Sequence, residues 1–143
     1  MKERILFLCT GNYYRSRFAE LLFNYLAEKE ELPFQSFSKG LRLSKRNKGP
    51  LSLYTNNYLR DKNIELPSRL RMPIPVSKDD FSYYDRIIAM DEVEHRKLMQ
   101  EFFPVEENRI EYWSFADDYI EKPDLVLPKL EAKVYALVNQ LKK

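Results

Sequence analysis

The chain has 143 residues, close to the length of one ordinary globular domain, and we expect residues 1–143 to fold as a single domain. Its 24 Lys and Arg residues nearly balance 22 Asp and Glu residues, which leaves a net charge of +2 and gives no indication of nucleic-acid binding. The longest apolar run near the N-terminus, residues 5–9, is too short for a membrane span or a signal peptide. We therefore expect a cytoplasmic protein without a membrane partner.

Rare residue types exclude several kinds of functional site. The single cysteine, Cys9, excludes an intramolecular disulfide, a CxxC redox pair and a zinc site built from several thiolates. The single histidine, His95, leaves little for a histidine-built metal site, and the three glycines cannot form a GxGxxG fingerprint or a Walker A loop. The chemistry must therefore use Cys9, carboxylates, arginines and backbone amides, and we expect no metal and no cofactor.

Apolar runs alternate with amphipathic stretches along the first half of the chain. Residues 5–8 form a continuous apolar run of strand length, and residues 16–26 carry apolar side chains at helical spacing. After Pro33, residues 34–37 can form a short second strand, and residues 51–58 indicate a helix. This order predicts a strand, a loop, a helix, a strand and a second helix.

The second half repeats the alternation. Residues 87–90 predict a third strand, and Asp91 with Glu94 has the pattern of a capping box for the helix that follows. Residues 110–113 predict a fourth strand, and residues 127–141 predict the clearest helix of the chain. The expected apolar face of the helix after Asp91 comprises Val93, Leu98 and Phe102, with His95 exposed.

Strands that alternate with helices predict an α/β fold, a parallel sheet with helices on both faces, because parallel connections need crossovers. Open parallel sheets bind ligands beyond the carboxyl ends of their strands. Cys9 ends the first predicted strand and Asp91 ends the third, while Asp117 and Asp118 follow the fourth. We therefore expect the thiol and the carboxylates to meet at one edge of the sheet.

Residues 9–16, CTGNYYRS, lead from the first strand into the first helix. A turn of this length can curl so that successive N–H groups point inward, which makes an anion cradle strengthened by the helix dipole. The amides, the dipole and Arg15 favour a thiolate at Cys9, and Arg15 can also hold a phosphoryl group. Gly11 permits the turn, Asn12 tolerates left-handed dihedral angles, and Ser16 can hydrogen-bond the sulfur.

Residues 5–20, ILFLCTGNYYRSRFAE, resemble the opening of the low-molecular-weight protein tyrosine phosphatase family, whose loop typically reads C-x-G-N-x-C-R-S-P. Residues 84–98, YDRIIAMDEVEHRKL, resemble that family's strand and helix around A-M-D, and residues 116–119 stand where the family keeps its D-P-Y loop. Ser38 resembles the serine that braces the phosphate loop. The resemblance is weakest over residues 41–76 and implies a four-stranded parallel sheet in the order 2-1-3-4.

The resemblance also implies a mechanism and a set of site residues. Cys9 is the expected nucleophile, Arg15 binds the phosphate oxygens, and Asp117 is the general acid, so the reaction passes through a cysteinyl-phosphate without a metal. The expected substrate is a phosphorylated protein or a small aryl phosphate, and we expect a monomer. The other residues expected at the phosphate or the substrate are Thr10, Gly11, Asn12, Tyr13, Tyr14, Ser16 and Tyr119.

Three departures from the family pattern keep alternatives open. Tyr14 replaces the usual second cysteine, Tyr13 replaces a smaller residue of the pocket wall, and Asp118 replaces the proline of D-P-Y. These changes fit a retuned phosphatase or a catalytically weak, phosphate-binding relative (a pseudophosphatase). Protein-arginine phosphatase activity is a third alternative, because Tyr13 occupies a position that helps to set substrate choice.

Overall fold

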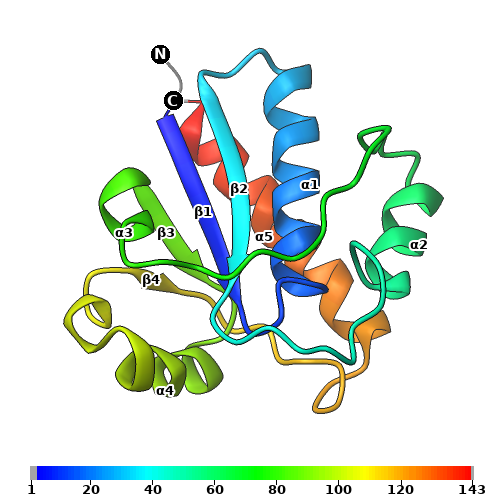
Figure 1. Cartoon of the computed structure of the whole chain (residues 1–143). Coiled ribbons are helices and arrows are strands. Elements are labelled where there is room, and N and C mark those ends of the chain that lie inside the picture. Colours follow the sequence, from blue (N-terminus) through cyan, green and yellow to red (C-terminus); the bar gives the residue numbers. More distant parts are fainter. Residues whose placement is uncertain (1–2, 143) are drawn as a thin grey trace.

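A computed structural model describes residues 3–142 of the chain. Its centre is a parallel sheet of four strands in the order β2-β1-β3-β4 (Figure 1). The order and the parallel direction confirm the predicted fold class. The strands are β1 (Glu3–Cys9), β2 (Phe34–Gly40), β3 (Arg86–Ala89) and β4 (Glu111–Tyr112).

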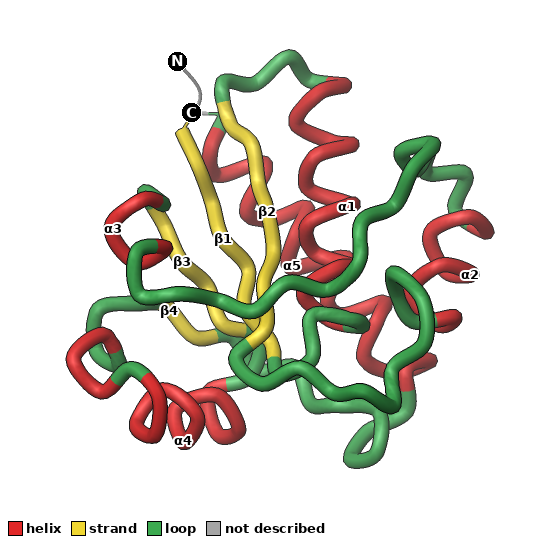
Figure 2. The backbone as a smooth tube through the Cα atoms, in the orientation of Figure 1, coloured by secondary structure: helices red, strands yellow, loops and turns green. Residues whose placement is uncertain are grey.

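Helices cover both faces of the sheet (Figure 2). The long helices α1 (Arg15–Lys29) and α5 (Pro123–Leu141) lie together on one face, with α2 (Leu53–Asp61) beside them. The opposite face carries α3 (Asp80–Tyr83) and α4 (Glu92–Phe102), followed by a 3₁₀ turn, η1 (Pro104–Glu106). Within residues 3–142, no helix combines the length and the apolar character that crossing a membrane requires.

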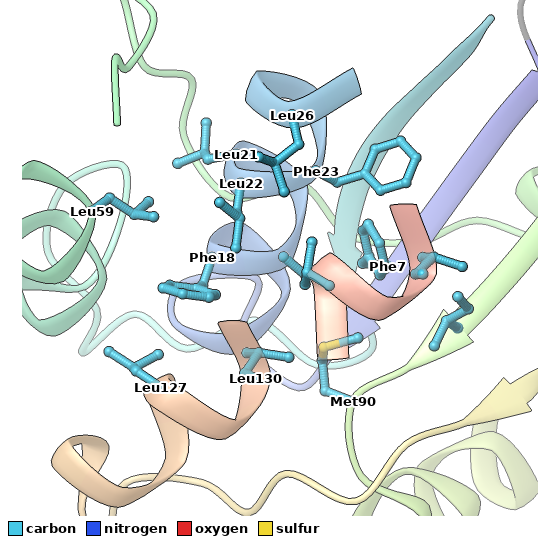
Figure 3. Packing of buried hydrophobic residues seen from close by; sticks show 14 of the residues in the cluster. Phe7, Phe18, Leu21, Leu22, Phe23, Leu26, Leu59, Met90, Leu127 and Leu130 are labelled. Atoms are coloured by element: carbon cyan, nitrogen blue, oxygen red, sulfur yellow. The ribbon is translucent and has the colours of Figure 1, made fainter. Parts of the chain in front are cut away.

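The central strand β1 supplies side chains to both layers of the core. Ile5 and Phe7 pack in the larger cluster with α1 and α5, whereas Leu6 and Leu8 pack in the smaller cluster with α4. Figure 3 shows Phe7 among the side chains of α1 and α5. Burial on both faces explains why residues 5–8 are continuously apolar rather than alternating.

The predicted apolar face of α4 is wrong in two of its three positions. Leu98 is buried, but Val93 is 73% exposed and Phe102 is 42% exposed. His95, which the sequence predicts to be exposed, is fully buried. The helix turns this polar residue inward because its ring nitrogens find hydrogen-bond partners at the start of α4 and beside Cys9, where an apolar side chain would leave those partners unpaired.

Three connecting segments gather at the carboxyl ends of the strands. The strand β2 extends beyond its predicted end to Gly40, which pairs with Cys9 across the sheet and places Ser38 within the strand. Residues 62–79 cross this end of the sheet, where Gly40 N–H donates to the Ile74 carbonyl at 2.9 Å. Residues 41–52 and the segment before α5 lie at the same end (Figure 1).

Candidate active site

Cys9 lies at the end of β1, directly before the loop that leads into α1. Its side chain is buried, and Sγ lies 2.8 Å from Ser16 Oγ in the first turn of α1. Because that turn leaves its first N–H groups without helical partners, the start of α1 offers hydrogen-bond donors close to the sulfur. The site can therefore hold an anion against Sγ.

Asn12 holds the loop in its shape. Its φ angle is 52°, in the left-handed region that costs energy for a residue with a side chain. Its Nδ2 donates to Ser16 Oγ at 3.0 Å and to Ser38 Oγ at 2.8 Å. Its Oδ1 accepts from Arg71 Nη1 and from Ile74 N–H, both at 3.0 Å. These four hydrogen bonds offset the strain and join the loop to β2 and to residues 62–79.

A buried ionic network lies beneath the loop. Ser38 Oγ donates to Glu20 Oε1 at 2.5 Å. This Glu20 oxygen also accepts from Arg71 Nη2 at 2.9 Å and from Arg17 Nη1 at 3.2 Å. Burial lowers the pKa values of both arginines, yet an ordinary arginine titrates so far above neutrality that both stay charged. Two guanidinium groups against one carboxylate leave a positive charge under the site, which favours a bound anion.

Arg15 opens α1 and is 1% exposed. Its Nη1 donates to Glu94 Oε1 at 3.0 Å and to the Phe115 carbonyl at 2.9 Å. Its Nη2 donates to Glu94 Oε2 at 2.9 Å and lies 3.3 Å from Asp117 Oδ2. The tertiary structure therefore brings Cys9, Arg15 and Asp117 to one edge of the sheet, as the sequence predicts, and adds Glu94 to them.

Glu94 and His95 connect α4 to Arg15 and to Thr10. His95 Nδ1 accepts from the Asp91 N–H at 2.9 Å, so the proton of the neutral ring sits on Nε2, which faces Thr10 Oγ1 at 3.2 Å and Glu94 Oε2 at 3.3 Å. Burial lowers the pKa of His95, which keeps the ring neutral. Although burial opposes ionisation of Glu94, hydrogen bonds from His95, Arg15 and Thr10 hold its pKa well below its usual range.

The capping-box prediction is therefore half right. Asp91 Oδ2 accepts from the Glu94 N–H at 3.1 Å and caps α4. The Glu94 side chain, however, does not return to the helix start, because the Arg15 guanidinium offers it a charged partner with two donors.

Tyr13 and Tyr14 contact different parts of the molecule. Tyr13 Oη donates to the Lys48 carbonyl at 2.5 Å, and its own carbonyl accepts from Ser52 N–H at 2.7 Å. Tyr14 is buried against Tyr54, with ring centroids 6.3 Å apart. The pair thus fixes residues 41–52 and α2 beside the loop.

The remaining predicted residues occupy the loop turn and the outer side of the site. A Cβ atom at Gly11 would lie 2.8 Å from the Asn47 side-chain nitrogen, so a larger residue here would displace the Asn47 side chain. Asp118 is exposed, and partial desolvation of its carboxyl group together with the charge of Asp117 raises the pKa of Asp118. Tyr119 is 77% exposed. Among residues 3–142, no group of three or more His, Cys, Asp or Glu side chains is arranged to hold a metal ion.

Sequence reasoning missed Arg17, Glu20, Arg71 and Glu94 as parts of the site. A partial signal existed for Arg17 and Glu20, because two charged residues three apart interrupt the apolar face of a helix. No pattern pointed to Arg71, which lies in an irregular segment 59 positions from the asparagine that it holds. For Glu94, the sequence indicated only a helix-capping role.

Residues 4–143 match the family described as low molecular weight phosphotyrosine protein phosphatase. Among solved structures, a mutant of YwlE from Bacillus subtilis shares 25% identity with a TM-score of 0.80, over 99% of this chain and 100% of that one. The YwlE arginine phosphatase from Geobacillus stearothermophilus shares 25% identity with a TM-score of 0.76, over 98% and 93%.

A low molecular weight phosphotyrosine phosphatase from Vibrio cholerae O395 shares the fold, with 22% identity and a TM-score of 0.83, over 99% and 97% of the two chains. A search of curated proteins finds no match.

Proposed function

The chain belongs to the low molecular weight phosphotyrosine protein phosphatase family, and from this premise we propose that it hydrolyses phosphate monoesters with Cys9 as the nucleophile. The observation that carries the proposal is the position of Sγ, buried at the end of β1 beside the start of α1 and above a network with excess positive charge. Such surroundings favour both a thiolate and a bound phosphate.

The reaction has two steps. The Cys9 thiolate attacks phosphorus in line, the S–P bond forms, and the bond from phosphorus to the leaving oxygen breaks while Asp117 gives that oxygen its proton. Asp117 then takes a proton from water, the water oxygen attacks phosphorus, and the S–P bond breaks to release phosphate and thiolate. The ion pair between Arg15 and Asp117 at 3.3 Å supports this division of roles, because it puts the acid beside the phosphate-binding group.

The loop residues supply the remaining contacts with phosphate. In this proposal their backbone N–H groups and Arg15 hold the equatorial oxygens, and Ser16 hydrogen-bonds the sulfur. Ser38 keeps Asn12 in place, and Tyr119 flanks the entering substrate. The loop residues concerned are Thr10, Gly11, Asn12, Tyr13, Tyr14 and Ser16.

We propose phosphotyrosine in a protein, or another aryl phosphate, as the substrate. The aromatic rings of Tyr13 and Tyr54 beside the loop support this choice, because they can contact a phenyl group. Phosphoarginine is the second candidate, which the similarity to two YwlE structures at 25% identity favours. Comparing turnover of phosphotyrosyl and phosphoarginyl peptides of the same sequence separates the two.

Release of para-nitrophenol from para-nitrophenyl phosphate tests the proposed activity. We expect turnover by the wild type and a loss of at least about a thousandfold in Cys9→Ser, since the hydroxyl is a far weaker nucleophile than a thiolate. Calorimetry should show that Cys9→Ser still binds inorganic phosphate, because the amides and Arg15 are unchanged. Turnover by Cys9→Ser near the wild-type rate contradicts the mechanism. Phosphate binding without wild-type turnover favours the catalytically weak relative.

A further inference from the structure

The Arg15 guanidinium has an end, formed by Nη1 and Nη2, and a side edge, formed by Nε and Nη2, and the two have different hydrogen-bond partners. The end formed by Nη1 and Nη2 is taken by both carboxylate oxygens of Glu94, at 3.0 and 2.9 Å. We propose that Glu94 is a positioning residue, which holds this end so that the side edge, formed by Nε and Nη2, is presented to the phosphate. This inference rests on the proposed function and names a residue that acts through Arg15.

Counting donors supports the assignment of the edges. A guanidinium has five N–H donors in a planar fork. Nη1 uses both of its hydrogens, on Glu94 and on the Phe115 carbonyl, and Nη2 gives one to Glu94 and faces Asp117 with the other. Nε has no partner among the described residues although it is buried. A buried unpaired donor is costly, so the side edge is the part of Arg15 left for a ligand.

The two carboxylates on Arg15 are held differently. Glu94 extends from α4 and is fixed by Thr10 Oγ1 and by the buried ring of His95 as well as by Arg15. Asp117 lies in a loop, and its side chain is 25% exposed. Within residues 3–142, the partners of its carboxylate are Arg15 and the backbone N–H of Asp118. An incoming phosphate therefore displaces Asp117 from Nη2 and leaves Glu94 in place.

Displacement gives the phosphate a bidentate contact, with one oxygen on Nε and another on Nη2. It also frees Asp117 from its ion pair, so that the carboxyl group can turn to the leaving oxygen. Without Glu94 the guanidinium loses its two-point contact and keeps the Phe115 carbonyl as its one fixed partner once Asp117 is displaced, so its side edge is less precisely placed. Misplacement of a binding group by about 1 Å can cost about a hundredfold in rate.

Three variants test the proposal. Glu94→Gln keeps the size of the side chain but places an amide donor against the donors of Arg15, whereas Glu94→Asp keeps the carboxylate on a shorter stem. Glu92→Gln is the matched control, since Glu92 lies two residues away on α4 and pairs with Arg96 at the surface, at 2.7 Å. Each variant is assayed with para-nitrophenyl phosphate and with inorganic phosphate as a competitive inhibitor, well below its melting temperature.

We expect Glu94→Gln to lower kcat/KM about 10- to 100-fold and to weaken phosphate inhibition by a similar factor. Glu94→Asp should recover part of both losses, and Glu92→Gln should stay within about twofold of the wild type. A purely structural role would lower Tm yet leave the inhibition constant of the folded protein unchanged. If Glu94→Gln does not fold, the inhibition constant of phosphate for Glu94→Asp tests the proposal instead. We expect weaker inhibition than in the wild type, because the shorter stem moves the carboxylate, and an inhibition constant equal to that of the wild type contradicts the proposal.

Two results overturn the inference. Unchanged kcat/KM and phosphate inhibition in Glu94→Gln mean that Arg15 needs no such clamp. Tighter phosphate inhibition in Glu94→Gln means that Glu94 competes with phosphate instead of positioning Arg15. In both cases an active wild type leaves the proposed function intact, whereas a wild type that neither turns over substrate nor binds phosphate removes the proposed function and this inference together.

Discussion

The site has a buried floor and an exposed rim, and they are held together in different ways. The floor, which comprises Asn12, Arg17, Glu20, Ser38 and Arg71, is a network in which every member has at least one partner in the network at 3.2 Å or less. The rim comprises residues 117–121. Its side chains are tied to the buried part of the site by one ion pair, from Asp117 to Arg15. The difference teaches that the proposed phosphate site rests on fixed groups, whereas the proposed proton transfer rests on a weakly held one.

Among changes to the floor and the rim, Asp117→Asn should show the largest effect on activity and almost none on stability. We expect turnover of phenyl phosphate, a poor leaving group, to fall about 100- to 1,000-fold, with a much smaller loss for para-nitrophenyl phosphate. The free energy of unfolding should change by less than about 0.5 kcal/mol, because Asn keeps the size of the side chain and an oxygen that can accept from Arg15. Steady-state kinetics and urea unfolding measure both, and a larger loss in Asp118→Asn would show that the adjacent aspartate is the acid.

Arg71→Met should damage the floor and so change stability and activity together. The change leaves Glu20 with one guanidinium partner and Asn12 with one acceptor bond fewer, and we expect a loss of about 1–3 kcal/mol in unfolding free energy. Weaker support for the left-handed Asn12 should lower kcat/KM about tenfold. Arg69→Met, at an exposed position in the same segment, is the control. Equal stability of the two variants would mean that the floor does not depend on Arg71.

The stability of the Glu94 contact should depend on pH in a defined direction. The folded pKa of Glu94 lies below the value of about 4.3 expected in the unfolded chain, so its stabilising contribution is complete above that value and is lost as the pH falls below it. The difference in unfolding free energy between wild type and Glu94→Gln should therefore narrow from pH 7 to pH 3. Chemical unfolding at both pH values measures it, and a constant difference would show that the charge of Glu94 does not contribute.

The smallest effect is expected from the basic segment beside the rim. Arg42, Lys45, Arg46 and Lys48 are exposed, and Tyr13 ties their segment to the loop. Replacing Lys45 and Arg46 by Gln should lower kcat/KM for acidic phosphotyrosyl peptides about two- to fivefold at low salt, and less at high salt. Turnover of para-nitrophenyl phosphate should not change, and Lys97→Gln with Lys129→Gln serves as the control for lost charge. Equal losses on neutral and acidic peptides would exclude an electrostatic role.

The sequence by itself determined the parts of the protein that depend on neighbours along the chain. The continuous apolar strand at residues 5–8, the helix that follows and the loop between them are consecutive, so backbone geometry alone brings Cys9, Arg15 and Ser16 together. The alternation of strands and helices predicted the parallel sheet, because a parallel crossover needs a helix.

Only the tertiary structure decided which distant residues complete the site. Arg71 reaches Asn12 from an irregular segment, and Glu94 reaches Arg15 because the first turn of α4 lies against Thr10, the residue that follows β1. The helical pattern predicted an exposed His95, but the residue is buried, because the hydrogen bond of its ring with Thr10 forms only after α4 has packed. Such contacts carry no periodic signal, because they are set by how separate elements meet and not by the spacing of residues within one element.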